Sequence, residues 1–216
     1  MFDIDTYNKI SQKIKVLQKK TSIIAVSKNH PKKAVEIAMS YGVRVFGENR
    51  IQEAYTKFED LKKKDPNLEL HLTGPLQTNK VKKAVNLFDV FHTLDREKLA
   101  KEFFKVGSLD NKKFFIQVNT GKEETKSGIY VEELSEFINY CKIDLSLNII
   151  GLMCIPPIDD QPKKHFSILV DEAIKYNLPH LSMGMSADYM DAIKLNASYI
   201  RIGTALFGQR KKWKLK

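Results

Sequence analysis

Short apolar runs alternate with helical patterns along almost the whole chain, and this alternation limits the folds that are open to it. Runs short enough to be buried strands lie at residues 23–27, 43–47, 68–72, 90–94, 114–118, 148–153, 181–183 and 199–202. Amphipathic helical patterns separate these runs, and another such pattern extends from Ile4 to Leu17. The alternation predicts a parallel sheet whose strands are connected by helices.

Eight such strands favour a single-domain α/β protein, a (β/α)8 TIM barrel with an additional N-terminal helix, although 216 residues is compact against about 250 for a typical barrel. No linker divides the sequence, so we expect one domain over residues 1–216: a helix at about 3–20, a barrel at about 21–208 and a basic tail at 209–216. The alternative is an open doubly wound sheet. That fold carries a glycine-rich turn after its first strand, where this chain has Ser27-Lys28-Asn29-His30.

Composition excludes several classes of protein. With 43% hydrophobic and 29% charged residues, the chain has a globular rather than a disordered profile. No apolar run approaches the roughly 18 residues that a membrane-spanning helix needs. The first residues lack the basic and apolar regions of a signal peptide, and a chain with two cysteines has no disulfide framework. We therefore predict a cytoplasmic protein with no membrane partner.

The net charge of +10 is a weaker indication of function. A basic protein can bind nucleic acid, an anionic membrane surface or a phosphate-bearing ligand. Here the basic residues are scattered, except for those in the tail. We interpret them as solvated helix faces and expect no nucleic-acid partner.

In a barrel of this kind, ligands bind where the strands end, and phosphate groups favour the loops after the last two strands. Those loops contain Gly184 and Gly203, whose backbones can approach a ligand closely, and the hydroxyl groups of Ser186 and Thr204. Ser186 is also placed to begin the helix through Tyr189, whose amides would favour an anion. The alternative interpretation is ordinary turn glycines and a serine helix cap.

Lys28 follows the first buried strand, so its amine is expected in a partly desolvated barrel mouth. Desolvation and a neighbouring cation such as Arg201 would lower the pKa of this amine and make it a nucleophile toward an aldehyde. The alternative is a lysine that reaches out to water. With a phosphate site nearby, pyridoxal 5′-phosphate (PLP) and a sugar phosphate both fit. The five histidines show no ligand spacing, so no metal site is predicted.

The strand ends carry motifs that occur in order across nearly the whole chain. They are Ala25-Val-Ser-Lys28, Phe46-Gly-Glu-Asn49, His71-x-x-Gly74, Gln117-Val-Asn119, Lys126-x-Gly128, Gly151-Leu-Met153, Leu181-Ser-Met-Gly-Met-Ser186 and Arg201-Ile-Gly-Thr-Ala-Leu-Phe-Gly208. In these motifs the chain resembles the pyridoxal phosphate homeostasis proteins (the YggS/PROSC family). These proteins look like the N-terminal barrel domain of alanine racemase standing alone.

The resemblance implies a cofactor site with PLP bound to Lys28 as an internal aldimine. It further implies that Ser186, Gly203 and Thr204 hold the phosphate and that Arg201 approaches the pyridine nitrogen. Asn49 and Met153 would line the cofactor. An arginine beside that nitrogen disfavours its protonation and weakens the ring as an electron sink.

These implications favour a PLP carrier that buffers or delivers its cofactor without catalysing a reaction, so no catalytic residue is predicted. The alternative is a PLP-dependent amino-acid racemase or a related enzyme. Racemisation needs a second acid/base group on the face of the cofactor opposite lysine, and nothing in the sequence places Tyr189 or Tyr199 there. We expect a monomer, with apo forms of PLP-dependent enzymes as candidate acceptors.

Overall fold

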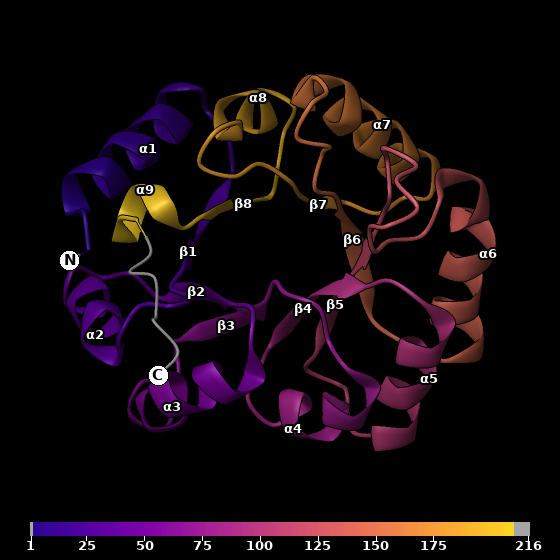
Figure 1. The fold of residues 1–216 in the computed structure, drawn as a ribbon, viewed down its shortest axis with the longest axis horizontal. Helices are drawn as coiled ribbons and strands as arrows, with labels where there is room; N and C mark the ends of the chain where they lie inside the picture. Colours follow the sequence, from indigo (N-terminus) through magenta and orange to yellow (C-terminus); the bar gives the residue numbers. More distant parts are fainter. Residues whose placement is uncertain (1, 210–216) are drawn as a thin grey trace.

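A computed structural model describes residues 2–209, in which eight parallel strands pair in sequence order and close into a barrel (Figure 1). The strands are β1 (Ser22–Val26), β2 (Val45–Glu48), β3 (Glu69–Leu72), β4 (Val90–Leu94), β5 (Lys113–Gln117), β6 (Ile149–Met153), β7 (His180–Ser182) and β8 (Tyr199–Ile202). The predicted barrel is confirmed, with strand ends shifted by two residues at most. Of the predicted basic tail, residues 210–216 lie outside the described residues.

Helices surround the strands in a ring (Figure 1). They are α1 (Ile4–Val16), α2 (Lys32–Ser40), α3 (Ile51–Lys64), α4 (Val81–Val85), α5 (Glu97–Val106), α6 (Leu134–Asn139), α7 (Pro162–Lys175), α8 (Tyr189–Lys194) and α9 (Thr204–Phe207). Helix α1 confirms the additional N-terminal helix, and the Asp3 side chain caps it by accepting from the Thr6 amide. Within residues 2–209, no helix is long and apolar enough to cross a membrane.

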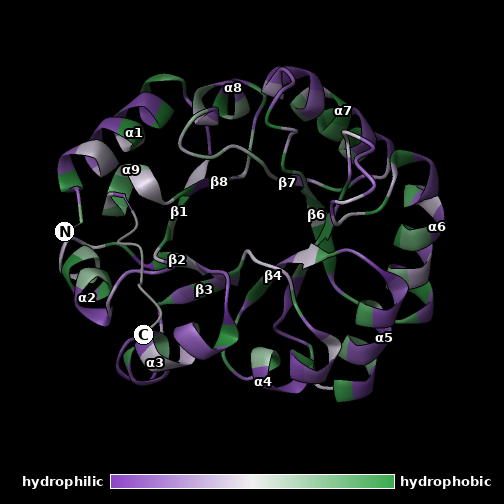
Figure 2. Ribbon diagram, viewed as in Figure 1, coloured by the Kyte–Doolittle hydropathy of each residue, from purple (hydrophilic) through white to green (hydrophobic). Residues whose placement is uncertain are grey.

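The main core lies between the strands and the helices. Most helices carry both hydrophobic and hydrophilic residues, as Figure 2 shows, because one face packs on the barrel and the other meets water. Helix α5 illustrates the pattern: Leu99 and Phe103 are buried against the strands, whereas Lys101 is exposed. Burying such a side chain contributes roughly 1.5 to 3 kcal/mol, so the ring of helices holds the barrel closed.

The barrel interior contains buried polar side chains as well as an apolar cluster. Its apolar cluster is small and consists of Val90, Phe115 and Met153, with Ile150 and Tyr199 packed against it. Beside it lie four buried polar side chains from different strands, His71, His92, Ser182 and Arg201. Buried polar groups are tolerated only when they are hydrogen-bonded, and these four are.

The pairing of β1 with β8 closes the barrel. Ile24 of β1 pairs with Arg201 of β8, and Ala25 pairs with Ile202. This register carries the loops that follow the first and the last strand to the same edge of the barrel. The loop after β1 begins with Ser27-Lys28, and the loop after β8 begins with Gly203-Thr204.

Gly151 of β6 should be indispensable for pairing with β7. A Cβ atom added there would lie 1.9 Å from the backbone oxygen of His180, which cannot rotate away as a side chain can. We expect Gly151→Ala to destabilise the protein by about 3 kcal/mol, at the upper end of the usual cost of overpacking. The measurement is the free energy of unfolding in urea.

Gly42→Ala is the matched control, because Gly42 follows α2 and an added Cβ atom there would have no atom within 4 Å. Its φ is +88°, so only the strain of a left-handed backbone, about 1 to 2 kcal/mol, opposes the change. Equal destabilisation by the two substitutions would contradict the steric explanation for Gly151.

Candidate functional site

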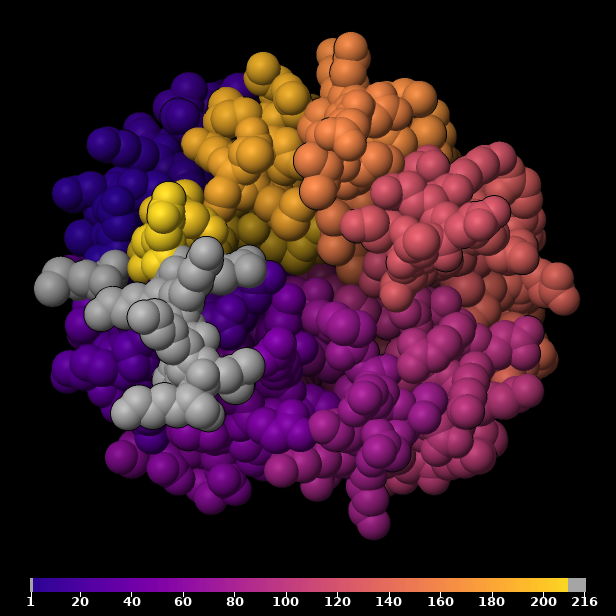
Figure 3. Space-filling model, viewed as in Figure 1, coloured from indigo at the N-terminus to yellow at the C-terminus, as the bar shows by residue number. Residues whose placement is uncertain are grey.

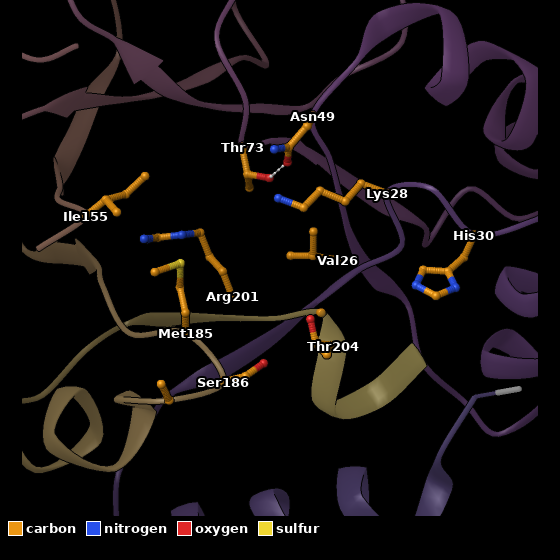
Figure 4. A pocket seen from close by; sticks show the side chains of 12 residues that line it. Val26, Lys28, His30, Asn49, Thr73, Ile155, Met185, Ser186, Arg201 and Thr204 are labelled. Carbon is orange, nitrogen blue, oxygen red and sulfur yellow. Dashed lines mark hydrogen bonds between the residues drawn. The ribbon is translucent and has the colours of Figure 1, made fainter. Parts of the chain in front are cut away.

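A cavity of about 300 Å³ opens at the carboxyl ends of the strands, within the volume range of small-molecule sites. Figure 3 shows a hollow near the centre of one face of the molecule, and Figure 4 shows the cavity lining from close by. The lining residues are Val26, Lys28, His30, Asn49, Thr73, Ile155, Met185, Ser186, Ala187, Arg201, Gly203 and Thr204. The structure therefore brings together all the predicted site residues except Met153.

Three details of the predicted site differ in the structure. Met153 is fully buried in the interior cluster with Phe115 and does not line the cavity. Gly184 does not line it either: its φ of +90° and the nearby Ala192 Cβ, 2.5 Å from an added Cβ, explain the glycine by packing against α8. Ser186 does not begin α8, because that helix starts at Tyr189 and the Asp188 carboxylate accepts from the Met185 amide in the preceding turn.

The Lys28 side chain points into the cavity, and its amine lies near Thr73 and opposite Arg201 in Figure 4. Lys28 sits in a tight turn between β1 and α2, in which Asn29 has a left-handed φ of +63°. The His30 amide donates to the Ser27 carbonyl at 3.1 Å. The turn fixes the backbone of Lys28 and therefore the direction in which its half-buried side chain leaves the main chain.

A cluster of buried charged side chains holds this turn in place. The Lys57 amine donates to the Ser27 carbonyl at 2.7 Å, to the Glu48 carboxylate at 2.8 Å and to the Glu53 carboxylate at 2.6 Å. The Ser27 hydroxyl also donates to Glu48, at 2.6 Å. Glu53 in turn accepts from the Asn29 amide. Residues on either side of Lys28 are thus bound to one buried cation and two carboxylates.

Burial raises the pKa of the Glu48 carboxyl, and the charge of Lys57 partly opposes that increase. One carboxylate oxygen of Glu48 is buried without a hydrogen-bond partner among the described residues. Its ionised form therefore depends on Lys57, because desolvation penalises a lone buried charge heavily.

Arg201 brings a positive charge to the floor of the cavity. Its guanidinium donates to the Ser182 hydroxyl at 2.8 Å and to the Cys154 carbonyl at 2.9 Å, both of which are neutral acceptors. Burial lowers the pKa of Arg201 from its usual value, yet guanidinium groups remain charged in proteins. Within residues 2–209 no carboxylate makes a salt bridge with it, and Asp188 raises its pKa through charge alone. A buried cation that no carboxylate contacts favours an electron-rich or anionic group in the cavity.

Cys154 is buried beside this arginine, and burial raises the pKa of its thiol to about 12. A thiol with that pKa carries almost no thiolate at neutral pH and is a poor nucleophile. Cys154 therefore contributes a small buried side chain and no nucleophile to the site.

The loops after β7 and β8 form the other side of the cavity. In Figure 4 the Ser186 and Thr204 hydroxyl groups face one another across a gap. The Ala205 amide approaches the Ser186 hydroxyl at 3.5 Å. Amides at the start of a helix such as α9 have no partner within the helix. Two hydroxyls and these amides form a donor set that suits a phosphate group.

Thr73 and Gly74 belong to the site, although the sequence patterns did not identify them as site residues. The Thr73 hydroxyl donates to the Asn49 side-chain oxygen at 2.9 Å and thereby fixes that amide at the edge of the cavity. A Cβ atom on Gly74 would lie 2.5 Å from the Asn49 backbone oxygen, so only glycine permits this approach. In the sequence, Gly74 after β3 was the one indication that this segment belongs to the site.

The donor set fits an aldehyde that also carries a phosphate group. A lysine amine can condense with the aldehyde, and the hydroxyls and amides can bind the phosphate. The buried guanidinium can face the part of the ligand between these two groups. A metal ion does not fit as well, because residues 2–209 contain no group of three or more His, Cys, Asp or Glu side chains suited to hold one.

Comparisons with known proteins agree with this chemistry. A family model of the alanine racemase N-terminal domain matches residues 6–211. The pyridoxal phosphate homeostasis protein of Aquifex aeolicus (strain VF5) is 42% identical over 200 residues, which cover 88% of this chain and 87% of that protein. PipY of Synechococcus elongatus PCC7942, whose structure was solved with PLP bound, is 35% identical with a TM-score of 0.77, over 88% of this chain and 93% of that chain.

Alanine racemase of Corynebacterium glutamicum shares the fold alone. It is 16% identical to this chain with a TM-score of 0.70, and the match covers 100% of this chain and 64% of the racemase. The barrel is thus common to both proteins, and about a third of the racemase chain lies outside the match.

Lys57→Met should leave the Glu48 carboxylate buried without its cation. Breaking a buried ion pair in this way costs about 3 to 5 kcal/mol, and urea unfolding at pH 8 measures the loss. Lys63→Met, on the exposed face of the same helix, is the control. Its ion pair with Glu59 is largely exposed, so a change below about 0.5 kcal/mol is expected.

The penalty of Lys57→Met should also depend on pH. Lys57 lowers the pKa of Glu48, so its removal raises the folded-state pKa of that carboxyl further. A carboxyl with a raised pKa contributes stability below its unfolded pKa and loses that contribution as the pH rises through the folded pKa. The deficit of the variant should therefore be smaller at pH 5 than at pH 8, and the opposite trend would contradict the assigned partner.

Proposed function

The chain belongs to the pyridoxal phosphate homeostasis protein family, which carries the alanine racemase N-terminal domain, and we propose that its cavity binds PLP for intracellular PLP homeostasis. The observation that carries the proposal is the meeting of the Lys28 amine, the buried Arg201 guanidinium and the Ser186 and Thr204 hydroxyls in one cavity. When bound, PLP supplies an aldehyde carbon and an electron-accepting ring.

Lys28 is the residue that we propose to hold the cofactor covalently. Its neutral Nζ would be the nucleophile toward the aldehyde carbon that PLP supplies, and the lysine side chain would then hold the cofactor by a covalent bond. The cluster around Lys57 fixes the residues on both sides of Lys28, so the amine is oriented before the cofactor enters. Such preorganisation lowers the entropic cost of binding.

Ser186, Gly203 and Thr204 are proposed to hold the phosphate, and Asn49 to lie along the cofactor. Arg201 is proposed to approach the pyridine nitrogen. Its charge opposes protonation of that nitrogen and thereby reduces the capacity of the ring to accept electrons. This effect supports a carrier that stores and delivers the cofactor over an enzyme that turns substrate over.

The racemase alternative lacks structural support within the described residues. Racemisation needs a second acid/base group opposite lysine, and the two tyrosines considered for that role do not line the cavity. Tyr189 lies on α8, where its hydroxyl accepts from Lys13. Tyr199 lies in the barrel interior against His71. We accordingly propose that the protein catalyses no reaction on amino acids.

Delivery to apo forms of PLP-dependent enzymes completes the proposed role. The relative in Aquifex aeolicus is named for pyridoxal phosphate homeostasis, and the half-buried Lys28 would leave an attached cofactor accessible to water for release. A cytoplasmic location and a monomeric state stay predictions from the sequence.

Lys28→Ala tests the covalent attachment. The wild-type protein with added PLP should show a visible Schiff-base absorption band, and borohydride reduction should leave an adduct on the peptide that contains Lys28. The substitution should abolish both. Lys33→Ala, a neighbouring and exposed lysine on α2, should abolish neither. An adduct that persists in Lys28→Ala would overturn the assignment.

Ser186→Ala and Thr204→Ala test the phosphate site. Each removes one hydroxyl donor to a charged group, which is worth about 1.5 to 3 kcal/mol, so the affinity for PLP should fall about 10-fold to 100-fold. Binding of pyridoxal, which lacks the phosphate, should be unchanged. Equal weakening for both ligands would show that these hydroxyls do not contact the phosphate.

A further inference from the structure

A continuous chain of hydrogen bonds runs through the barrel interior to Arg201. The Glu69 carboxylate lies 2.7 Å from His71 Nε2, and His71 Nδ1 lies 2.7 Å from His92 Nε2. His92 Nδ1 lies 2.8 Å from the Ser182 hydroxyl, which lies 2.8 Å from the Arg201 guanidinium. The chain starts at the first residue of β3, at the barrel end opposite the cavity, and ends at the cavity floor.

Two constraints determine the direction of every hydrogen bond in this chain. A carboxylate can only accept, so His71 donates from Nε2 to Glu69. Full burial keeps both histidines neutral, so each ring carries one hydrogen. His71 Nδ1 must then accept from His92 Nε2, and His92 Nδ1 must accept the hydrogen of the Ser182 hydroxyl. Both rings are consequently protonated on Nε2, and the Ser182 oxygen accepts from Arg201, whose guanidinium can only donate.

The surroundings of the two histidines support this arrangement. Both rings are fully buried, and burial lowers the pKa of each, which keeps them neutral. Phe115 stacks on His92 with ring centroids 4.6 Å apart, and Tyr199 packs against His71 at 5.2 Å. The rings are therefore fixed in orientation as well as in charge.

The Glu69 end is fitted to supply a permanent negative charge. The hydrogen bond from His71 is the largest of the effects that lower the pKa of Glu69 to about 2. Lys113 contributes from the start of β5, with its amine 3.5 Å from the second carboxylate oxygen. The Glu69 side chain is 30% exposed, so the carboxylate stays partly hydrated.

We propose that Glu69 is a positioning residue for the cofactor site, acting through His71, His92 and Ser182 to hold the Arg201 guanidinium in place. Because the Ser182 hydrogen is committed to His92, its oxygen offers only lone pairs to Arg201. In a reversed chain the Ser182 oxygen would have to accept from both His92 and Arg201, and its own hydrogen would lose its acceptor. The role of Arg201 toward PLP rests on the proposed function, whereas the direction of the chain does not.

The first test needs no cofactor. Nitrogen-15 NMR of the histidine rings in the wild-type protein at pH 7 distinguishes the two neutral tautomers. We expect the Nε2–H form at both His71 and His92. An Nδ1–H tautomer, or a doubly protonated ring, at either position would overturn the proposed direction.

The second test weakens the end of the chain without changing its shape. In Glu69→Gln the amide can accept or donate, so the bias on direction is lost and the Nδ1–H form should appear at both histidines together. PLP affinity should fall about threefold to tenfold, with a shift of the Schiff-base absorption band. Glu59→Gln, an exposed carboxylate on α3, should change neither quantity.

Ser182→Ala separates the positioning of Arg201 from the direction of the hydrogen bonds. It removes the acceptor of Arg201 but leaves Glu69 in place, so PLP affinity should fall about tenfold while both histidines keep the Nε2–H form. A Glu69→Gln protein with altered tautomers but wild-type PLP affinity would overturn the positioning role. If the wild-type protein bound no PLP at all, the proposed function would fail, and the tautomers would still decide the direction of the chain.

Discussion

The pairing of β1 with β8 is the interaction on which the other features of this protein depend. Ile24 pairs with Arg201, so the loop that carries Lys28 lies beside the last strand instead of at the far end of an open sheet. The cavity draws its lining from loops near both ends of the chain. In an open sheet of the same strands, the lysine and the arginine would not share a site.

The buried charges around the cavity fall into two kinds. Lys57 is neutralised by Glu48 and Glu53, which makes it part of the scaffold that fixes the turn at Lys28. Among the described residues, both hydrogen-bond acceptors of Arg201 are neutral, so its charge remains available to a ligand. This division lets the Lys57 cluster orient the Lys28 amine while Arg201 presents its charge to the cavity, because Lys57 and Arg201 do not compete for one carboxylate.

Local patterns predicted the barrel from the sequence, and together with the family resemblance they predicted six of the residues that line the cavity. Strand length and apolar content located all eight strands, and the residues at the strand ends, together with the family resemblance, led to Lys28, Asn49, Ser186, Arg201, Gly203 and Thr204. Met153 was assigned to the cavity by resemblance alone, and its inward packing on Phe115 depends on contacts between strands. The chain from Glu69 to Arg201 joins four strands, so no local spacing could reveal it.

The closure of the barrel also has a consequence for synthesis on the ribosome. Val26 and Lys28 are made early, whereas Gly203 and Thr204 follow the eighth strand. A nascent chain with seven strands holds the lysine but lacks the buried Arg201 and the part of the cavity lining that Gly203 and Thr204 supply. The ligand site therefore comes into existence only when β8 has emerged and paired, so that ligand binding reports the completion of the fold.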